Sequence, residues 1–193
     1  MYHNLPRDAS FWTFLSSIDQ DLANSTRQEG CPCGGRLHSA KYPRKPRGDD
    51  NLPGEYGHRL SFCCAQDGCR KRATPPSVRF LGRKVYLHAV VILVAAMRQG
   101  PSPRRVRELS QLFGADRRTI ARWQVFWQEQ FPQTQFWKAA RGRLAPGVAL
   151  GALPLSLLDA FLGRDDSSDK WGRLLRFLSP ITITGGLAIA VSR

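Results

Sequence analysis

The chain has 193 residues, of which 42% are hydrophobic, so a buried core is possible in one medium domain or in two or three small modules. Its most apolar stretch, Ala89–Met97, is far shorter than the roughly 20 residues that a membrane-spanning helix needs, so we expect no such span. An excess of 29 Lys and Arg over 15 Asp and Glu gives a formal net charge of +14 and points to polyanionic partners.

The positive charge is concentrated in the centre of the chain. Residues 31–143 hold 22 basic and seven acidic side chains, whereas residues 1–30 hold two and four, and residues 144–193 hold five and four. A basic region between near-neutral ends is typical of a surface that binds a polyanion. No export signal is visible at the start, so we expect a protein of the reducing cytoplasm. Its five cysteines are then better explained by metal binding or burial than by disulfides.

Residues 1–28 are predicted to contain a short amphipathic helix. Phe11, Leu15, Ile18 and Leu22 recur at helical spacing, and Asp8 is a suitable N-terminal cap. We therefore expect one face of this helix to dock on another part of the chain.

Residues 29–80 carry all the cysteines, in the sequences CPCGG and FCCAQDGC. Two thiol pairs about 30 residues apart match the layout of a zinc ribbon, in which two hairpin turns supply two thiolates each. The strand that enters such a turn often reads aromatic-x-Cys, so Phe62 favours Cys64 over Cys63 as a ligand. We predict a structural Zn²⁺ site made by Cys31, Cys33, Cys64 and Cys69.

The cysteine spacing leaves alternatives open. The first pair has a one-residue spacer and the second has four or five, whereas two is usual. Cys63 is therefore the alternative to Cys64, and His38 or His58 would substitute if the short C-P-C sequence placed only one sulfur on the metal. Four protein ligands leave no open position for water, so no hydrolytic chemistry is expected.

The basic sequence RKRATPPSVRFLGRK connects the cysteines to the next segment. Its Thr-Pro-Pro turn prevents a helix or a central strand from continuing through it. We consider two interpretations equally: the stretch lies along a nucleic acid, or it is a solvated linker.

Residues 81–143 are predicted to form a tri-helical domain with a helix-turn-helix. Val106–Phe113 reads as the first short helix, and Gly114 ends it in a left-handed conformation. Asp116 then caps a second helix, Arg117–Phe131, which Pro132 closes. The apolar run before them would supply the supporting helix. The three-residue turn is typical of DNA-binding proteins; the alternative is a plain helical hairpin with a solvated arginine face.

In the predicted helix-turn-helix, Ile120 and Trp123 face the first helix. The start of the second helix is then exposed for the major groove, where arginine pairs with guanine, and basic residues beside the first helix reach phosphates. The predicted DNA-binding residues are Arg117, Arg118, Thr119 and Arg122 on the second helix, Arg104, Arg105 and Arg107 by the first, and Arg70, Lys71 and Arg72 after the cysteines.

Residues 144–193 contain two apolar helical patches, LPLSLLDAFLG and KWGRLLRFLS. We predict short C-terminal helices that either pack on the helical core or bind a partner. A group of aspartates lies between and beside them without room for a ribonuclease-H-like sheet, and is expected to serve as caps and loop residues: Asp159, Asp165, Asp166 and Asp169. We predict no catalytic residues and an α+β, mainly α, fold.

The order of a cysteine-pair ribbon, GCRKR, a basic turn and RRTIARW resembles the N-terminal DNA-binding portion of bacterial insertion-sequence transposases and their accessory proteins, over roughly residues 31–143. The resemblance implies recognition of element ends, with strand transfer left to a separate acidic domain. We therefore expect a non-enzymatic, zinc-stabilised protein that binds double-stranded DNA. The resemblance also implies a bacterial protein associated with the nucleoid. A transposase or recombinase subunit and a second copy of the chain are its expected partners. The alternatives are a stand-alone transcriptional regulator, a DNA-cleaving enzyme and an RNA-binding ribbon protein.

Overall fold

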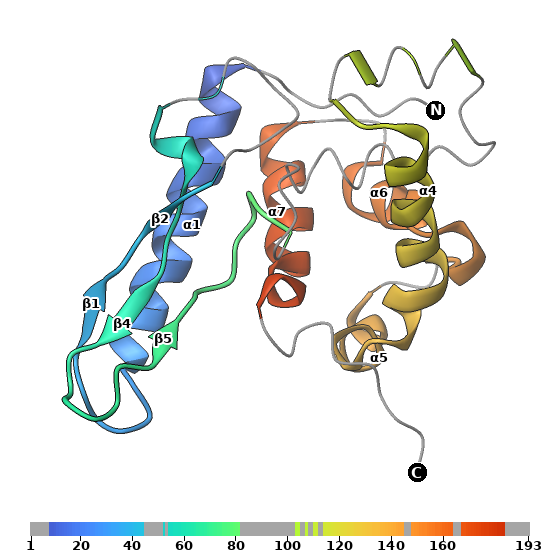
Figure 1. Cartoon of the computed structure of the whole chain (residues 1–193). Coiled ribbons are helices and arrows are strands. Elements are labelled where there is room, and N and C mark those ends of the chain that lie inside the picture. Colours follow the sequence, from blue (N-terminus) through green and yellow to red (C-terminus); the bar gives the residue numbers. More distant parts are fainter. Residues whose placement is uncertain are drawn as a thin grey trace.

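The computed structural model describes residues 8–44, 52, 54–81, 103–104, 107, 110–111, 114–144, 148–163 and 167–183. Within these ranges the fold is α+β and mainly helical, with small antiparallel sheets early in the chain and shorter helices after them (Figure 1). None of the helices described has both the length and the apolar character required to cross a membrane.

The first helix, α1 (Ala9–Glu29), begins at the predicted cap. The Asp8 carboxylate accepts a hydrogen bond of 2.8 Å from the Phe11 N–H, which satisfies one of the free amides at the helix start. The helix ends at Gly30, whose φ of 74° favours glycine. Its buried face is formed by Phe11, Trp12, Leu15, Ile18, Asp19 and Ala23.

Two small sheets follow α1. The first is three-stranded and antiparallel, with β4 (Phe62–Cys64) between β1 (Leu37–Ser39) and β5 (Arg72–Ala73). The second pairs β2 (Tyr42–Pro43) with β3 (His58–Arg59). Because side chains alternate between the faces of a sheet, the register fixes which cysteine points to which side.

The rest of the described fold is helical. α4 (Arg117–Val125) continues through one π-helical turn and a 3₁₀ turn that ends at Gln133, so the helix passes the predicted stop at Pro132 by one residue. Thr134 caps α5 (Gln135–Ala140) by accepting a hydrogen bond from the Trp137 N–H. Two helices follow, α6 (Leu155–Leu162) and α7 (Ser168–Leu178).

A single buried cluster joins parts of all four predicted segments. It contains Phe11 and Trp12 of α1, Val78, Trp127 of the helical segment, and the C-terminal residue Leu175. A second, smaller cluster joins Ala23 of α1 to the cysteine-bearing sheet. α1 therefore packs against both the sheet and the helices, a question that the sequence left open (Figure 1).

The segment after β5 is part of the core, so the solvated-linker and nucleic-acid interpretations are both wrong for residues 77–81. Ser77, Val78, Phe80 and Leu81 are all at most 2% exposed, and Arg79 is only 3% exposed. This stretch passes between the sheet and α7 in Figure 1. Its polar groups are satisfied internally, because the Ser77 N–H donates to the Thr182 hydroxyl over 2.9 Å.

The C-terminal helices pack on the core. Leu157, Leu158, Trp171, Leu174 and Leu178 are all 0% exposed. Gly172 lets α7 approach α1 closely, since a Cβ there would lie 2.6 Å from the Phe14 ring. Of the two predicted roles for these helices, core packing is confirmed.

Candidate metal centre

Two tight loops bring the predicted metal ligands together. In the first loop the Gly34 N–H donates to the Cys31 carbonyl over 2.8 Å, with Gly34 at a φ of 81°. In the second, the Cys69 N–H donates to the Gln66 carbonyl over 3.1 Å, and Gly68 also has a φ of 81°. A glycine in the left-handed region allows each loop to turn within so few residues. The one-residue C-P-C spacer therefore does not prevent both sulfurs from reaching the site.

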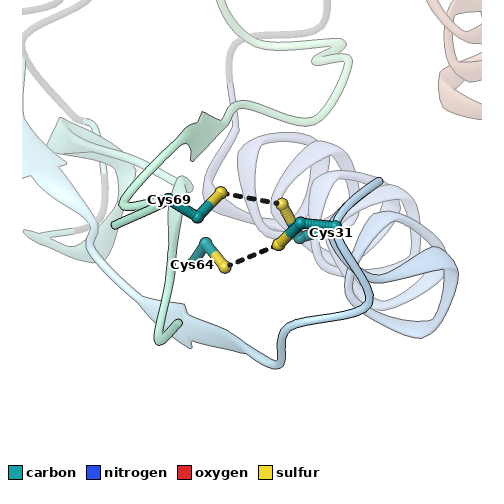
Figure 2. A group of neighbouring side chains, drawn as sticks. Cys31, Cys64 and Cys69 are labelled. Carbon is teal, nitrogen blue, oxygen red and sulfur yellow. Dashed lines mark hydrogen bonds between the residues drawn. The ribbon is translucent and has the colours of Figure 1, made fainter. Parts of the chain in front are cut away.

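The four sulfurs lie close enough together to surround one metal ion. Cys31 Sγ lies 3.7 Å from Cys69 Sγ, and Cys33 Sγ lies 3.5 Å from Cys64 Sγ. All four ligand atoms lie within 4.8 Å of one another, and the labelled side chains in Figure 2 point toward one another. Zn–S bonds of about 2.3 Å in a tetrahedron place sulfurs about 3.8 Å apart. The residues present thus fit a Zn²⁺ ion with four thiolate ligands.

The strand register explains why Cys64, and not Cys63, belongs to the cluster. Leu37 lies opposite Cys64, and both are buried against Ala23 of α1. The next pair, His38 and Cys63, must point to the other face. The preference for Cys64 is confirmed.

Neither histidine alternative is part of the cluster. His38 shares the outer face with Cys63, and His58 lies on β3 opposite Pro43 in the other sheet. Among the described residues, the four predicted cysteines alone form such a group.

The closeness of the four thiols helps to shift the pKa values of Cys33 and Cys64. The Gly35 N–H, together with the neighbouring thiols, lowers the pKa of Cys33 to about 7. The Gln66 N–H lowers the pKa of Cys64, but burial and the three neighbouring thiols outweigh it and raise this pKa to about 12. Four sulfurs this close cannot all ionise without a compensating positive charge. Zinc would supply that charge and hold the two loops together, because its binding free energy adds to the folding free energy.

Gly35 is a feature of the site that the ligand pattern did not single out. A Cβ at this position would lie 2.5 Å from Cys64 Sγ and 3.3 Å from Cys33 Sγ. The second glycine of CPCGG was the available signal, since a glycine two residues after a ligand allows a close approach of backbone and sulfur.

We expect Gly35→Ala to weaken zinc binding, because the added methyl group must displace Cys64 from its position on the metal. Substitution of a residue that supports a zinc ligand, without itself binding the metal, typically lowers zinc affinity about 10- to 100-fold, and we expect a loss of about this size here. Competition with a chromophoric chelator measures it. Gly54→Ala is the control, because a Cβ there meets nothing within 4 Å; equal zinc affinities of the two variants would contradict the assignment.

Three of the four predicted DNA-binding residues on α4 are exposed, as expected. Asp116 accepts a hydrogen bond of 2.6 Å from the Thr119 N–H and caps the helix as predicted. Gly114 has the expected left-handed φ of 63°. Ile120 and Trp123 are buried, while Arg117, Arg118 and Arg122 are exposed.

Thr119 differs from its predicted exposure beside these arginines. It is only 6% exposed, and its hydroxyl accepts a hydrogen bond of 2.9 Å from Arg122. Its place in the first turn, behind the Asp116 cap, turns the side chain inward. Thr119 therefore orients Arg122 instead of offering a free hydroxyl to a ligand.

Of the other predicted DNA-binding residues, all except Arg105 lie within the described part of the chain. Arg104 and Arg107 are helical and exposed, whereas Arg105 and most of Val106–Phe113 lie outside the described residues, as do Asp165 and Asp166. Arg70, Lys71 and Arg72 are exposed beside the cysteine cluster, and Arg70 forms an ion pair of 2.8 Å with Asp67.

Comparison of the chain with models of protein families, with curated proteins and with solved structures gives no match.

Proposed function

We propose that this chain is a zinc-stabilised protein that binds double-stranded DNA sequence-specifically and carries no catalytic site of its own. The observation that carries the proposal is the start of α4, where Arg117, Arg118 and Arg122 are exposed while Ile120 and Trp123 are buried. A short rigid helix that presents arginines from its first two turns is suited to the major groove.

The local structure supports the presentation of these arginines. The Asp116 cap and the buried residues fix the helix in the core, so the guanidinium groups extend from a rigid support. The Ser110 carbonyl accepts a hydrogen bond of 2.8 Å from the Gly114 N–H, as expected where a preceding helix ends. Both features agree with a helix-turn-helix, which we include in the proposal.

The four-cysteine site has a structural role in this proposal. The strands around it are only two or three residues long, so their apolar contacts alone are too few to hold the sheet. Zinc would fix the sheet against α1, which in turn packs with the helical core. We call the closed Cys₄ arrangement a zinc ribbon on this basis.

A role beside a transposase or recombinase is the more specific part of the proposal. It rests on the order of the sequence features, and a stand-alone regulator remains the alternative. Size exclusion with a palindromic and a non-palindromic site discriminates them, because a dimeric regulator would require the palindrome.

The test of DNA binding is Arg118→Ala. We expect this change to reduce discrimination between a duplex selected from a random pool and a scrambled duplex by about 1–3 kcal/mol, the usual value of one bidentate arginine–guanine pair. Fluorescence anisotropy at several salt concentrations measures both affinities. Arg173→Ala on α7 is the charge-matched control, since Arg173 is also exposed. Absence of duplex binding by the unmodified protein, or unchanged discrimination by Arg118→Ala, would contradict the proposal.

A further inference from the structure

The three-stranded sheet has two chemically different faces. Leu37, Phe62 and Cys64 are buried on the face that meets α1. The opposite face, here called the outer sheet face, carries His38, Cys63 and Arg72 in one cross-strand row, because His38 pairs with Cys63 and Cys63 with Arg72.

Basic side chains surround this row. Arg36 directly precedes β1, two residues before His38, and the hydrogen bond from the Ala65 N–H to its carbonyl extends the antiparallel pairing to it. It therefore shares the outer sheet face with His38 and, like His38 and Arg72, is exposed. Among the described residues, Asp67 is in an ion pair with Arg70, and Glu55 is in one with Lys41.

Arg72 is held in position on this face. Its guanidinium donates to the Ser61 hydroxyl over 3.4 Å and lies 5.6 Å from the centre of the Tyr42 ring. A stacked guanidinium keeps further N–H donors for a bidentate contact and loses less entropy when it binds a phosphate.

A cavity of about 460 Å³ adjoins the same basic residues. It lies between the end of α1 and the first cysteine loop, and Arg27, Arg36 and His38 line it together with Glu29. Two arginines against one carboxylate give this cavity an excess of positive charge. The cavity thus extends the positive surface beyond the sheet.

We propose that the outer sheet face, with Arg36 and Arg72 as its anchors, binds the phosphate backbone of duplex DNA as a second contact surface beside α4. This inference rests on the proposed function and assigns the sheet a part in it. The row spans two strand spacings, about 10 Å, so Arg36 and Arg72 can each contact a different phosphate of a duplex that carries one phosphate per about 3.4 Å of helix axis on each strand. Guanidinium groups donate several hydrogen bonds to phosphate oxygens, and contacts to phosphate carry no base preference.

The experiment is a salt titration of duplex binding by the double variant Arg36→Ala/Arg72→Ala. We expect the slope of log affinity against log salt to fall by about 1.8, that is about 0.9 for each lost phosphate contact. Affinities for the selected and scrambled duplexes should fall by the same factor. Arg36→Lys/Arg72→Lys should restore most of the slope, because it keeps both charges; zinc content confirms that each variant retains its fold.

Three results would overturn the inference. One is an unchanged slope in the double alanine variant, while Arg118→Ala still lowers discrimination; the proposed function would then stand without this surface. Another is an equal loss of slope in the control Arg173→Ala/Arg176→Ala on α7, which would indicate a general charge effect. The third is that single-stranded DNA or RNA competes with duplex for the unmodified protein but not for the double variant, which would assign the face to single strands.

Discussion

Cys64→Ser is expected to yield a protein without bound zinc, in which the sheet formed by residues 37–73 is unfolded. Cys64 is 1% exposed and belongs to both the sulfur cluster and the small apolar cluster under the sheet. Serine is a poor zinc ligand, and the three remaining thiols would hold the metal far more weakly. Because apparent binding free energies of structural zinc sites are about 10–16 kcal/mol, the loss greatly exceeds what these short strands could replace.

Cys63→Ser is the matched control, since it makes the same chemical change one residue earlier in the same strand. Cys63 points to the outer sheet face and is outside the sulfur cluster, so this variant should retain one zinc per chain. Emission spectroscopy of freshly purified protein gives the metal content, and amide hydrogen exchange reports the sheet. Full zinc in Cys64→Ser, or a folded sheet in metal-free unmodified protein, would contradict the assignment of the site.

The ligand set could be predicted from the sequence because it depends on local rules. Two thiol pairs at ribbon spacing specify a four-sulfur site, and the period of two in a strand separates Cys64 from Cys63 once Phe62 is assigned inward. The irregular spacers were uncertain because loop geometry depends on backbone angles. Gly34 and Gly68 adopt left-handed conformations that bring the cysteines of each loop together, and cysteine spacing alone does not predict these conformations.

The caps of α1 and α4 were likewise predictable, since Asp8 and Asp116 act within three residues of their own positions. The burial of residues 77–81 was not. It depends on contacts between residues far apart in sequence, such as the apolar packing of Val78 and Leu81 and the ion pair between Asp19 and Arg79, which are 60 residues apart. A basic stretch with two prolines looks like a linker when these partners are unknown. Long-range pairing overrides composition in this segment.

The position of α1 between the two buried clusters determines how the segments of the chain depend on one another. The sequence divides into the segments 1–28, 29–80, 81–143 and 144–193, yet α1 connects the cysteine-bearing sheet to the helical core through both buried clusters. An unfolded sheet would therefore also deprive α1 of part of its packing. We infer that the metal stabilises the support of α4 as well as the sheet.

Asp19→Asn is the second change with a large expected effect, a loss of about 3–5 kcal/mol in the free energy of unfolding. The Asp19 side chain is 0% exposed and lies 2.7 Å from Nε of Arg79, which is 3% exposed. The carboxylate also accepts hydrogen bonds of 2.6 Å from the Ser77 hydroxyl and the Val78 N–H. Asparagine removes the negative charge and turns one acceptor into a donor, so a buried guanidinium remains without compensation.

Asp21→Asn is the matched control on the same helix. Asp21 is 70% exposed and lies 3.9 Å from Arg176, so solvent screening limits its contribution to about 0–1 kcal/mol. Urea denaturation of the zinc-loaded proteins, followed by tryptophan fluorescence, measures both variants. The carbonyls of Tyr56 and His58 still accept hydrogen bonds from Arg79, but neutral acceptors do not balance its charge. Similar stabilities of the two variants would mean that these carbonyls alone suffice, and that the Asp19 carboxylate is not what holds residues 77–81 in the core.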